Sequence, residues 1–118
     1  MTIGLGPAPI TTWVRICAVD DLLSERGAAA LVGDRQIALF RTYDGQVHAL
    51  DNLDPFSGAY VLARGIVGSR GDVPTVTSPM HKQVFDLRTG ACLSVPGVAV
   101  STHAVSCAGG IVRVETAR

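Results

Sequence analysis

The sequence has few aromatic residues, a single lysine and no excess of charge of either sign. Phe, Trp and Tyr account for 5% of the 118 residues, and ten basic side chains balance ten acidic ones. This balance provides no field for attracting nucleic acid or an anionic lipid surface. No apolar run approaches the roughly 18 residues of a membrane span. The first residues lack the basic and apolar segments of a signal peptide, so we expect a cytoplasmic protein.

Cysteine is also scarce, and its spacing excludes the common metal and disulfide frameworks. Cys17, Cys92 and Cys107 are odd in number and form no CxxC pair, so neither a zinc site nor a disulfide scaffold is indicated. We interpret all three as small buried hydrophobic residues in a reducing compartment.

Hydrophobic residues, in contrast, are abundant. They make up 47% of the sequence, which argues against a disordered chain and allows one domain with a sizeable core. Gly4, Gly6, Pro7 and Pro9 interrupt the first residues. We therefore predict a flexible arm over residues 1–11 and a single domain over residues 12–118.

Short apolar runs bounded by Gly, Asp and Pro dominate the predicted domain. Val14 and Ile16 alternate with their neighbours, which is typical of a half-buried strand. Similar runs recur at roughly 8–12-residue spacing, which gives about nine or ten short strands. No helical pattern competes with them. The predicted fold class is therefore all-β, an antiparallel sandwich or barrel.

Two hairpins are predicted with particular clarity. Asp44-Gly45 stands between two apolar runs and favours a two-residue turn in which both residues have positive φ. A last hairpin is predicted between residues 103–107 and 111–115. Residues 52–64 and 78–82 lack a clear period, and we interpret them as ordered loops.

These two loops resemble the cluster-binding loops of Rieske proteins. Residues 51–56 read Asp-Asn-Leu-Asp-Pro-Phe and resemble the Rieske pattern D-N-x-C-P-H. About 25 residues further on, Ser78-Pro79-Met80-His81 resembles the pattern C-P-x-H. It is followed at residues 85–90 by Phe-Asp-Leu-x-Thr-Gly, which resembles the Rieske motif after that loop. The order, spacing and both prolines agree. The resemblance implies a Rieske-like domain over residues 12–118.

The residues at the four ligand positions differ from those of a Rieske protein. A Rieske [2Fe–2S] centre is held by two cysteines and two histidines. Asp54, Phe56 and Ser78 stand at three of these positions, and only His81 matches. Phe56 has no lone pair, whereas Asp54 and Ser78 offer hard oxygens where the cluster needs soft thiolates. We therefore predict that these positions are vestigial and that this chain has no metal, cofactor-binding or catalytic residue.

Three short motifs are similar to the small subunit of the assimilatory NAD(P)H-dependent nitrite reductase, a Rieske-like family without the cluster ligands. The motifs are Asn52-x-Asp54-Pro55-Phe56, Val61-Leu62-x-Arg64-Gly65 and Ser78-Pro79-x-x-Lys82-Gln83-x-Phe85. The resemblance implies a non-catalytic subunit, inactive when isolated, of an enzyme of nitrate assimilation that reduces nitrite to ammonium. It also implies a large-subunit partner that holds FAD, sirohaem and a [4Fe–4S] cluster.

The resemblance also suggests where that partner binds. In cluster-bearing relatives, the tip formed by the two loops faces the electron-transfer partner. We hypothesise a docking surface with apolar contacts and one charge, made of Asp54, Pro55, Phe56, Pro79, Met80, His81 and Lys82. Phe56 has a second interpretation, in which its ring fills the volume that a cluster would occupy.

Two other functions stay open at the level of sequence. One is a Rieske-type [2Fe–2S] ferredoxin that carries electrons, against which the missing ligands argue. The other is a stand-alone binding module that holds a small ligand at the tip, because a fold does not dictate a function.

Overall fold

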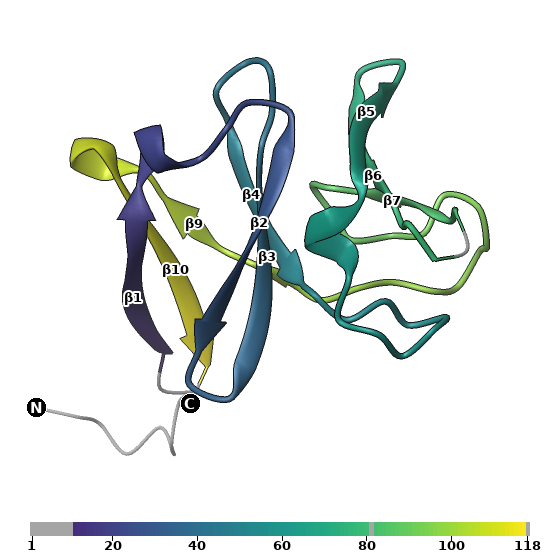
Figure 1. The fold of residues 1–118 in the computed structure, drawn as a ribbon, viewed down its shortest axis with the longest axis horizontal. Coiled ribbons are helices and arrows are strands. Elements are labelled where there is room, and N and C mark those ends of the chain that lie inside the picture. Colours follow the sequence, from purple (N-terminus) through teal and green to yellow (C-terminus); the bar gives the residue numbers. More distant parts are fainter. Residues whose placement is uncertain (1–10, 81, 118) are drawn as a thin grey trace, which may run out of the picture.

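The computed structural model of the chain describes residues 11–80 and 82–117 (Figure 1). The strands are β1 (Thr11–Ala18), β2 (Arg26–Val32), β3 (Arg35–Arg41), β4 (Val47–Asp51), β5 (Ile66–Arg70), β6 (Val73–Thr77), β7 (Val84–Asp86), β8 (Thr102–His103), β9 (Val105–Ser106) and β10 (Ile111–Ala117). Three single 3-10 turns are η1 (Val19–Asp21), η2 (Leu62–Arg64) and η3 (Ala108–Gly110). The all-β prediction is confirmed. Residues 1–10 of the predicted arm lie outside the described residues. Within the described part, no helix has the length and apolar character needed to cross a bilayer.

The strands form three antiparallel sheets, with the orders β1-β10-β9, β2-β3-β4-β8 and β5-β6-β7. In Figure 1 the sheet of β2, β3 and β4 lies between the other two. Its strand β3 contains the uninterrupted apolar run Ile37 to Phe40, and every side chain in this run is buried. Since successive side chains of a strand point to opposite faces, β3 can contribute to a core on each side.

Two hydrophobic cores follow from this alternation. Ile37 and Leu39 pack with Val112 and Val114 of β10, whereas Ala38 and Phe40 belong to a second core. The second core also contains Leu50, Leu62, Ala63, Val76, Phe85, Leu87, Cys92 and Val100. Full burial of a large apolar side chain contributes about 1.5–3 kcal/mol. The second core thus holds β6, β7 and the segment from Phe56 to Ala63 against the central sheet.

The hairpin at Asp44-Gly45 is confirmed, but the predicted turn type is wrong. Only Gly45 has a positive φ, of 82°, and its N–H donates to the Thr42 carbonyl over 2.9 Å. The Asp44 carboxylate accepts hydrogen bonds from the Thr42 hydroxyl and the Gln46 N–H. These side-chain bonds stabilise a longer loop with a single left-handed residue, which is the next most common hairpin connection.

The last predicted hairpin is confirmed, because β9 pairs with β10, but its first strand is shorter than residues 103–107, since the chain changes sheets at Ala104. His103 pairs with Ala49 of β4, whereas Val105 pairs with Val114 of β10. The His103 ring fixes the first of these pairings, since its Nε2 lies 2.7 Å from Asp51 Oδ1. The turn expected between β9 and β10 is present as η3.

The cysteines do not share one environment. Cys92 is buried in the second core, Cys17 is half-buried and Cys107 is exposed, and all three are free thiols. The prediction of a buried residue is therefore wrong for Cys107, because this residue lies directly before η3 at the surface.

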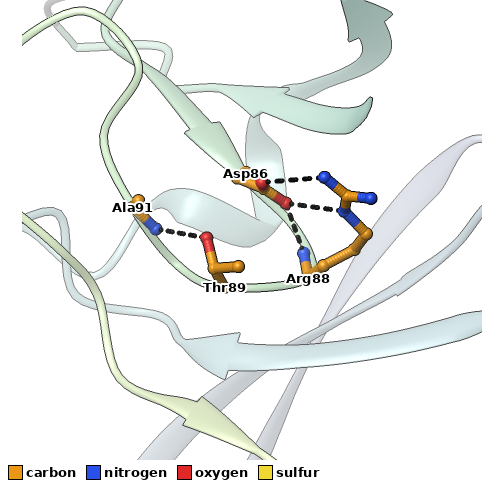
Figure 2. A network of polar contacts seen from close by, with 4 residues as sticks. All are labelled: Asp86, Arg88, Thr89 and Ala91. Atoms are coloured by element: carbon orange, nitrogen blue, oxygen red, sulfur yellow. Dashed lines mark hydrogen bonds and ion pairs between the residues drawn. The ribbon is translucent and has the colours of Figure 1, made fainter. Parts of the chain in front are cut away.

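β7 follows the second predicted loop, and the turn after β7 is held by side-chain hydrogen bonds (Figure 2). Asp86 accepts a hydrogen bond from the Arg88 N–H over 2.8 Å, and its carboxylate lies 3.4 Å from the Arg88 guanidinium. Burial raises the pKa of Asp86, but the hydrogen bonds and charge of Arg88 hold it below its usual value. Gly90 ends the turn with φ 78°, and a Cβ there would lie 1.9 Å from the Val100 carbonyl oxygen. Gly90 thus permits close packing, whereas the Thr89 hydroxyl accepts the Ala91 N–H over 3.2 Å.

Candidate functional site

The candidate site is the tip formed by loop 1 (residues 52–61) and loop 2 (residues 78–82). Asn52 anchors the start of loop 1, because its Oδ1 accepts the Ala63 N–H over 2.7 Å and its backbone carbonyl accepts the Leu62 N–H over 3.1 Å. Its Nδ2 donates to Gln36 Oε1 over 3.3 Å. The buried Asn52 therefore connects the central sheet, loop 1 and η2.

Asp54 and Ser78, at the positions that match the two cluster cysteines, form a direct bond between the loops. The Ser78 hydroxyl donates to Asp54 Oδ2 over 2.5 Å, and both residues are almost completely buried. Asp54 Oδ1 accepts the N–H of Phe56 over 2.8 Å and that of Ser57 over 3.4 Å. Buried carboxylates need such donors. The two loops are thus held together by oxygen atoms where sulfur atoms would hold a cluster.

The hydrogen bonds also determine the charge of Asp54. Burial raises the pKa of the Asp54 carboxyl. Hydrogen bonds from the Ser78 hydroxyl and from the N–H groups of Phe56 and Ser57 lower it, and together they outweigh burial. The net effect is a pKa below the usual value for aspartate. Asp54 is therefore ionised at neutral pH, although it is fully buried.

Phe56 lies at the position that matches the first cluster histidine, and its ring points into the protein. It is half-buried and packs against the second core. Its ring centroid lies 6.2 Å from that of Phe85, with a 51° angle between the ring planes, which is a favourable tilted arrangement. This packing supports the interpretation that Phe56 fills the volume of a missing cluster.

Loop 2 is a tight turn whose outer side is exposed. The Ser78 N–H donates to the Gln83 carbonyl over 2.9 Å, and the Lys82 N–H donates to the Ser78 carbonyl over 3.1 Å. Lys82 has a φ of 60°. Pro79, Met80 and Lys82 are exposed, with 50% of Met80 accessible to solvent.

The tip thus separates the predicted docking residues into two groups. Pro55, Pro79, Met80 and Lys82 are exposed, whereas Asp54 is buried and positions the loop instead. Phe56 is intermediate, and His81 lies outside the described residues.

Two further apolar side chains are exposed on loop 1, and the sequence did not predict them as part of the tip surface. Leu53 and Tyr60 are 37% and 54% exposed and form an isolated bridge across the loop. Neither residue belongs to a periodic run, so no sequence signal placed them beside each other.

The donor atoms at this tip do not fit a [2Fe–2S] cluster. An ionised carboxylate already bonded to a hydroxyl and a ring packed on Phe85 occupy three of the ligand positions. Hard oxygen donors and a phenyl ring are unsuited to iron–sulfur ligation. Within residues 11–80 and 82–117, no three His, Cys, Asp or Glu side chains gather in a way that could hold a metal ion.

The three sheets and paired loops define the class of protein as a Rieske-like domain. The sequence profile of the Rieske-like [2Fe-2S] domain family matches residues 12–115. Over 107 residues the chain is 38% identical to the nitrite reductase (NADH) small subunit of Escherichia coli K12, covering 90% of this chain and 99% of that protein. The chain belongs to the family of nitrite reductase small subunits, within the Rieske-like domains.

Two other relatives extend this comparison. A crystal structure from Mycobacterium tuberculosis, described as an NADH-dependent nitrite reductase small subunit, superimposes with a TM-score of 0.87 at 46% identity and covers 91% of this chain and 96% of its own. A segment of the nitrite reductase [NAD(P)H] large subunit of Klebsiella oxytoca is 50% identical over 82 residues. That match covers 70% of this chain and 8% of the large subunit.

Proposed function

We propose that this chain is the non-catalytic small subunit of an NAD(P)H-dependent nitrite reductase and that it docks through its tip on the large subunit. The observation that carries this proposal is the replacement of cluster ligands by the buried Asp54–Ser78 hydrogen bond and the Phe56 ring. The described residues of the tip join the two loops but offer no donor set for a [2Fe–2S] cluster.

In this proposal the chemistry belongs to the partner. The large subunit supplies FAD, sirohaem and a [4Fe–4S] cluster for the reduction of nitrite to ammonium, and this chain reduces no nitrite when isolated. The free thiols of Cys17, Cys92 and Cys107 support a reducing, cytoplasmic location. The segment similar to this chain within the Klebsiella oxytoca large subunit supports a close association of the two modules.

The exposed residues of the tip support docking there. Pro55, Pro79 and Met80 provide apolar surface, and Lys82 provides a charge beside them. Leu53 and Tyr60 extend the apolar area along loop 1. Apolar residues surrounded by a few polar groups are typical of protein interfaces, so this surface is the proposed interface.

Co-purification tests the proposal directly. The chain is co-expressed with a tagged large subunit from the same organism, and the captured complex is analysed by size-exclusion chromatography. We expect a stable complex with the wild-type chain and its loss with Met80→Asp. Leu23→Asp is the matched control, because Leu23 is 65% exposed and its neighbour Ser24 pairs with Arg41, at the opposite end of β3 from Gln36, which bonds to loop 1. Equal capture of both variants would place the interface elsewhere.

Two further measurements test whether the chain lacks a cluster and whether it is inactive without the large subunit. Iron, acid-labile sulfide and the visible spectrum are expected to show no stoichiometric cluster, whereas a Rieske ferredoxin contains two irons per cluster. NADH- or NADPH-dependent nitrite reduction is expected only when the large subunit is present. A coloured preparation with stoichiometric iron would instead support the electron-carrier function.

A further inference from the structure

Two energetically unfavourable features stand next to each other at the end of loop 2. Lys82 has a φ of 60°, and Glu25 is the only other non-glycine residue with positive φ in the described ranges. The neighbouring Gln83 has a buried side-chain carbonyl oxygen without a hydrogen-bond partner among the described residues. Left-handed backbone and buried unpaired oxygens are both rare in folded proteins, so this segment is not optimised for the stability of the isolated chain.

The fold itself does not require lysine at this position. The contact that closes loop 2 is made by the Lys82 backbone N–H, which every residue except proline possesses. Glycine adopts the left-handed region without the steric cost that a Cβ introduces. The Lys82 side chain is exposed and forms no ion pair with a described residue.

The surroundings of Lys82 indicate what its ammonium group could bind. It is the only lysine in the sequence, and it lies on the same short loop as the exposed Pro79 and Met80. A positive charge beside apolar surface is complementary to a carboxylate set in an apolar patch of a partner. A contact formed on docking becomes partly desolvated, which strengthens a charge-assisted hydrogen bond.

We propose that the Lys82 ammonium binds a carboxylate of the large subunit and that the left-handed backbone at residue 82 is kept for this contact. The inference rests on the proposed docking function and specifies its polar contact. Strained residues of this kind cluster at functional sites. Stability and binding therefore have opposite requirements at residue 82.

A matched pair of glycine variants separates these requirements. Lys82→Gly and Glu25→Gly each replace an exposed left-handed residue whose backbone N–H donates to a carbonyl, that of Ser78 or Arg41. We expect each variant to keep or raise the melting temperature of the isolated chain, by about 0–5 °C. Binding to the purified large subunit, measured by titration calorimetry, is expected to weaken at least about tenfold for Lys82→Gly only.

Two further measurements identify the nature of the contact. Lys82→Arg keeps the positive charge, so we expect it to retain most of the affinity. The salt dependence of binding should be weaker for Lys82→Gly than for the wild type, because one ion pair is lost. A lower melting temperature for Lys82→Gly, or unchanged affinity, would overturn the inference.

The outcomes also separate this inference from the proposed function. If wild type and Lys82→Gly bind the large subunit equally well, docking stands and only the role of Lys82 fails. If the wild-type chain does not bind the large subunit, both fail together.

Discussion

The inner side of the tip (Asp54 and Phe56) differs from its outer rim (Met80 and Lys82). The inner residues are fully bonded or packed within the chain, whereas the rim residues are not. On the inner side, Asp54 accepts three hydrogen bonds and Phe56 packs on Phe85. On the outer rim, Met80 is half exposed and Lys82 holds a left-handed backbone. The inner side thus joins the two loops through groups of the chain itself, whereas the rim leaves an apolar and a charged side chain exposed.

The largest expected effect is the loss of Asp54. Asp54→Ala leaves the Ser78 hydroxyl and two backbone N–H groups without their acceptor in a buried site. We therefore expect the free energy of unfolding to fall by about 3 kcal/mol. Urea denaturation measures this change, with the exposed Asp72→Ala as control at about 0.5 kcal/mol or less. A loss as small as that of the control would show that Asp54 does not connect the loops.

Truncation of Phe56 should have the next largest effect. Phe56→Ala removes a half-buried ring from the second core, and we expect a loss of about 2 kcal/mol, below the range for fully buried phenylalanine. Phe56→Leu keeps part of the apolar volume and should cost less. Thermal denaturation of both variants checks this order. Equal stability of the alanine variant and the wild type would instead support a role of Phe56 in docking alone.

Lowering the pH should remove the contribution of Asp54 to the stability of the folded chain. The folded-state pKa of Asp54 is lowered, so its stabilisation is complete above the unfolded-state pKa of about 3.9. It is lost as the pH falls through the lower folded-state value. The difference in melting temperature between wild type and Asp54→Asn should therefore shrink below about pH 4. A difference that stays constant from pH 7 to pH 3 would contradict an ionised Asp54.

The smallest expected effect on stability is on the outer rim. Met80→Ala removes an exposed side chain, so we expect the free energy of unfolding to change by about 0.5 kcal/mol or less. Urea denaturation checks this value beside the Asp54 variant. A loss similar to that of Asp54→Ala would erase the difference between the two sides of the tip.

The sequence predicted much of the fold because strand signals are local. Alternation in β1, the apolar run of β3 and the Asp44-Gly45 pair identify elements from a few adjacent residues. The change of sheets at Ala104 and the turn type at Gly45 were missed. Both depend on pairing partners or side-chain bonds that no short window contains.

The chemical nature of the tip was determined by the sequence alone, because the donor atoms of Asp54, Phe56 and Ser78 belong to the residues themselves. Only the tertiary structure decided how these atoms are used. It buried the Asp54–Ser78 bond between residues 24 positions apart and left Met80 on the surface. Burial and contact depend on segments that meet only after folding, so they cannot be read from either loop in isolation.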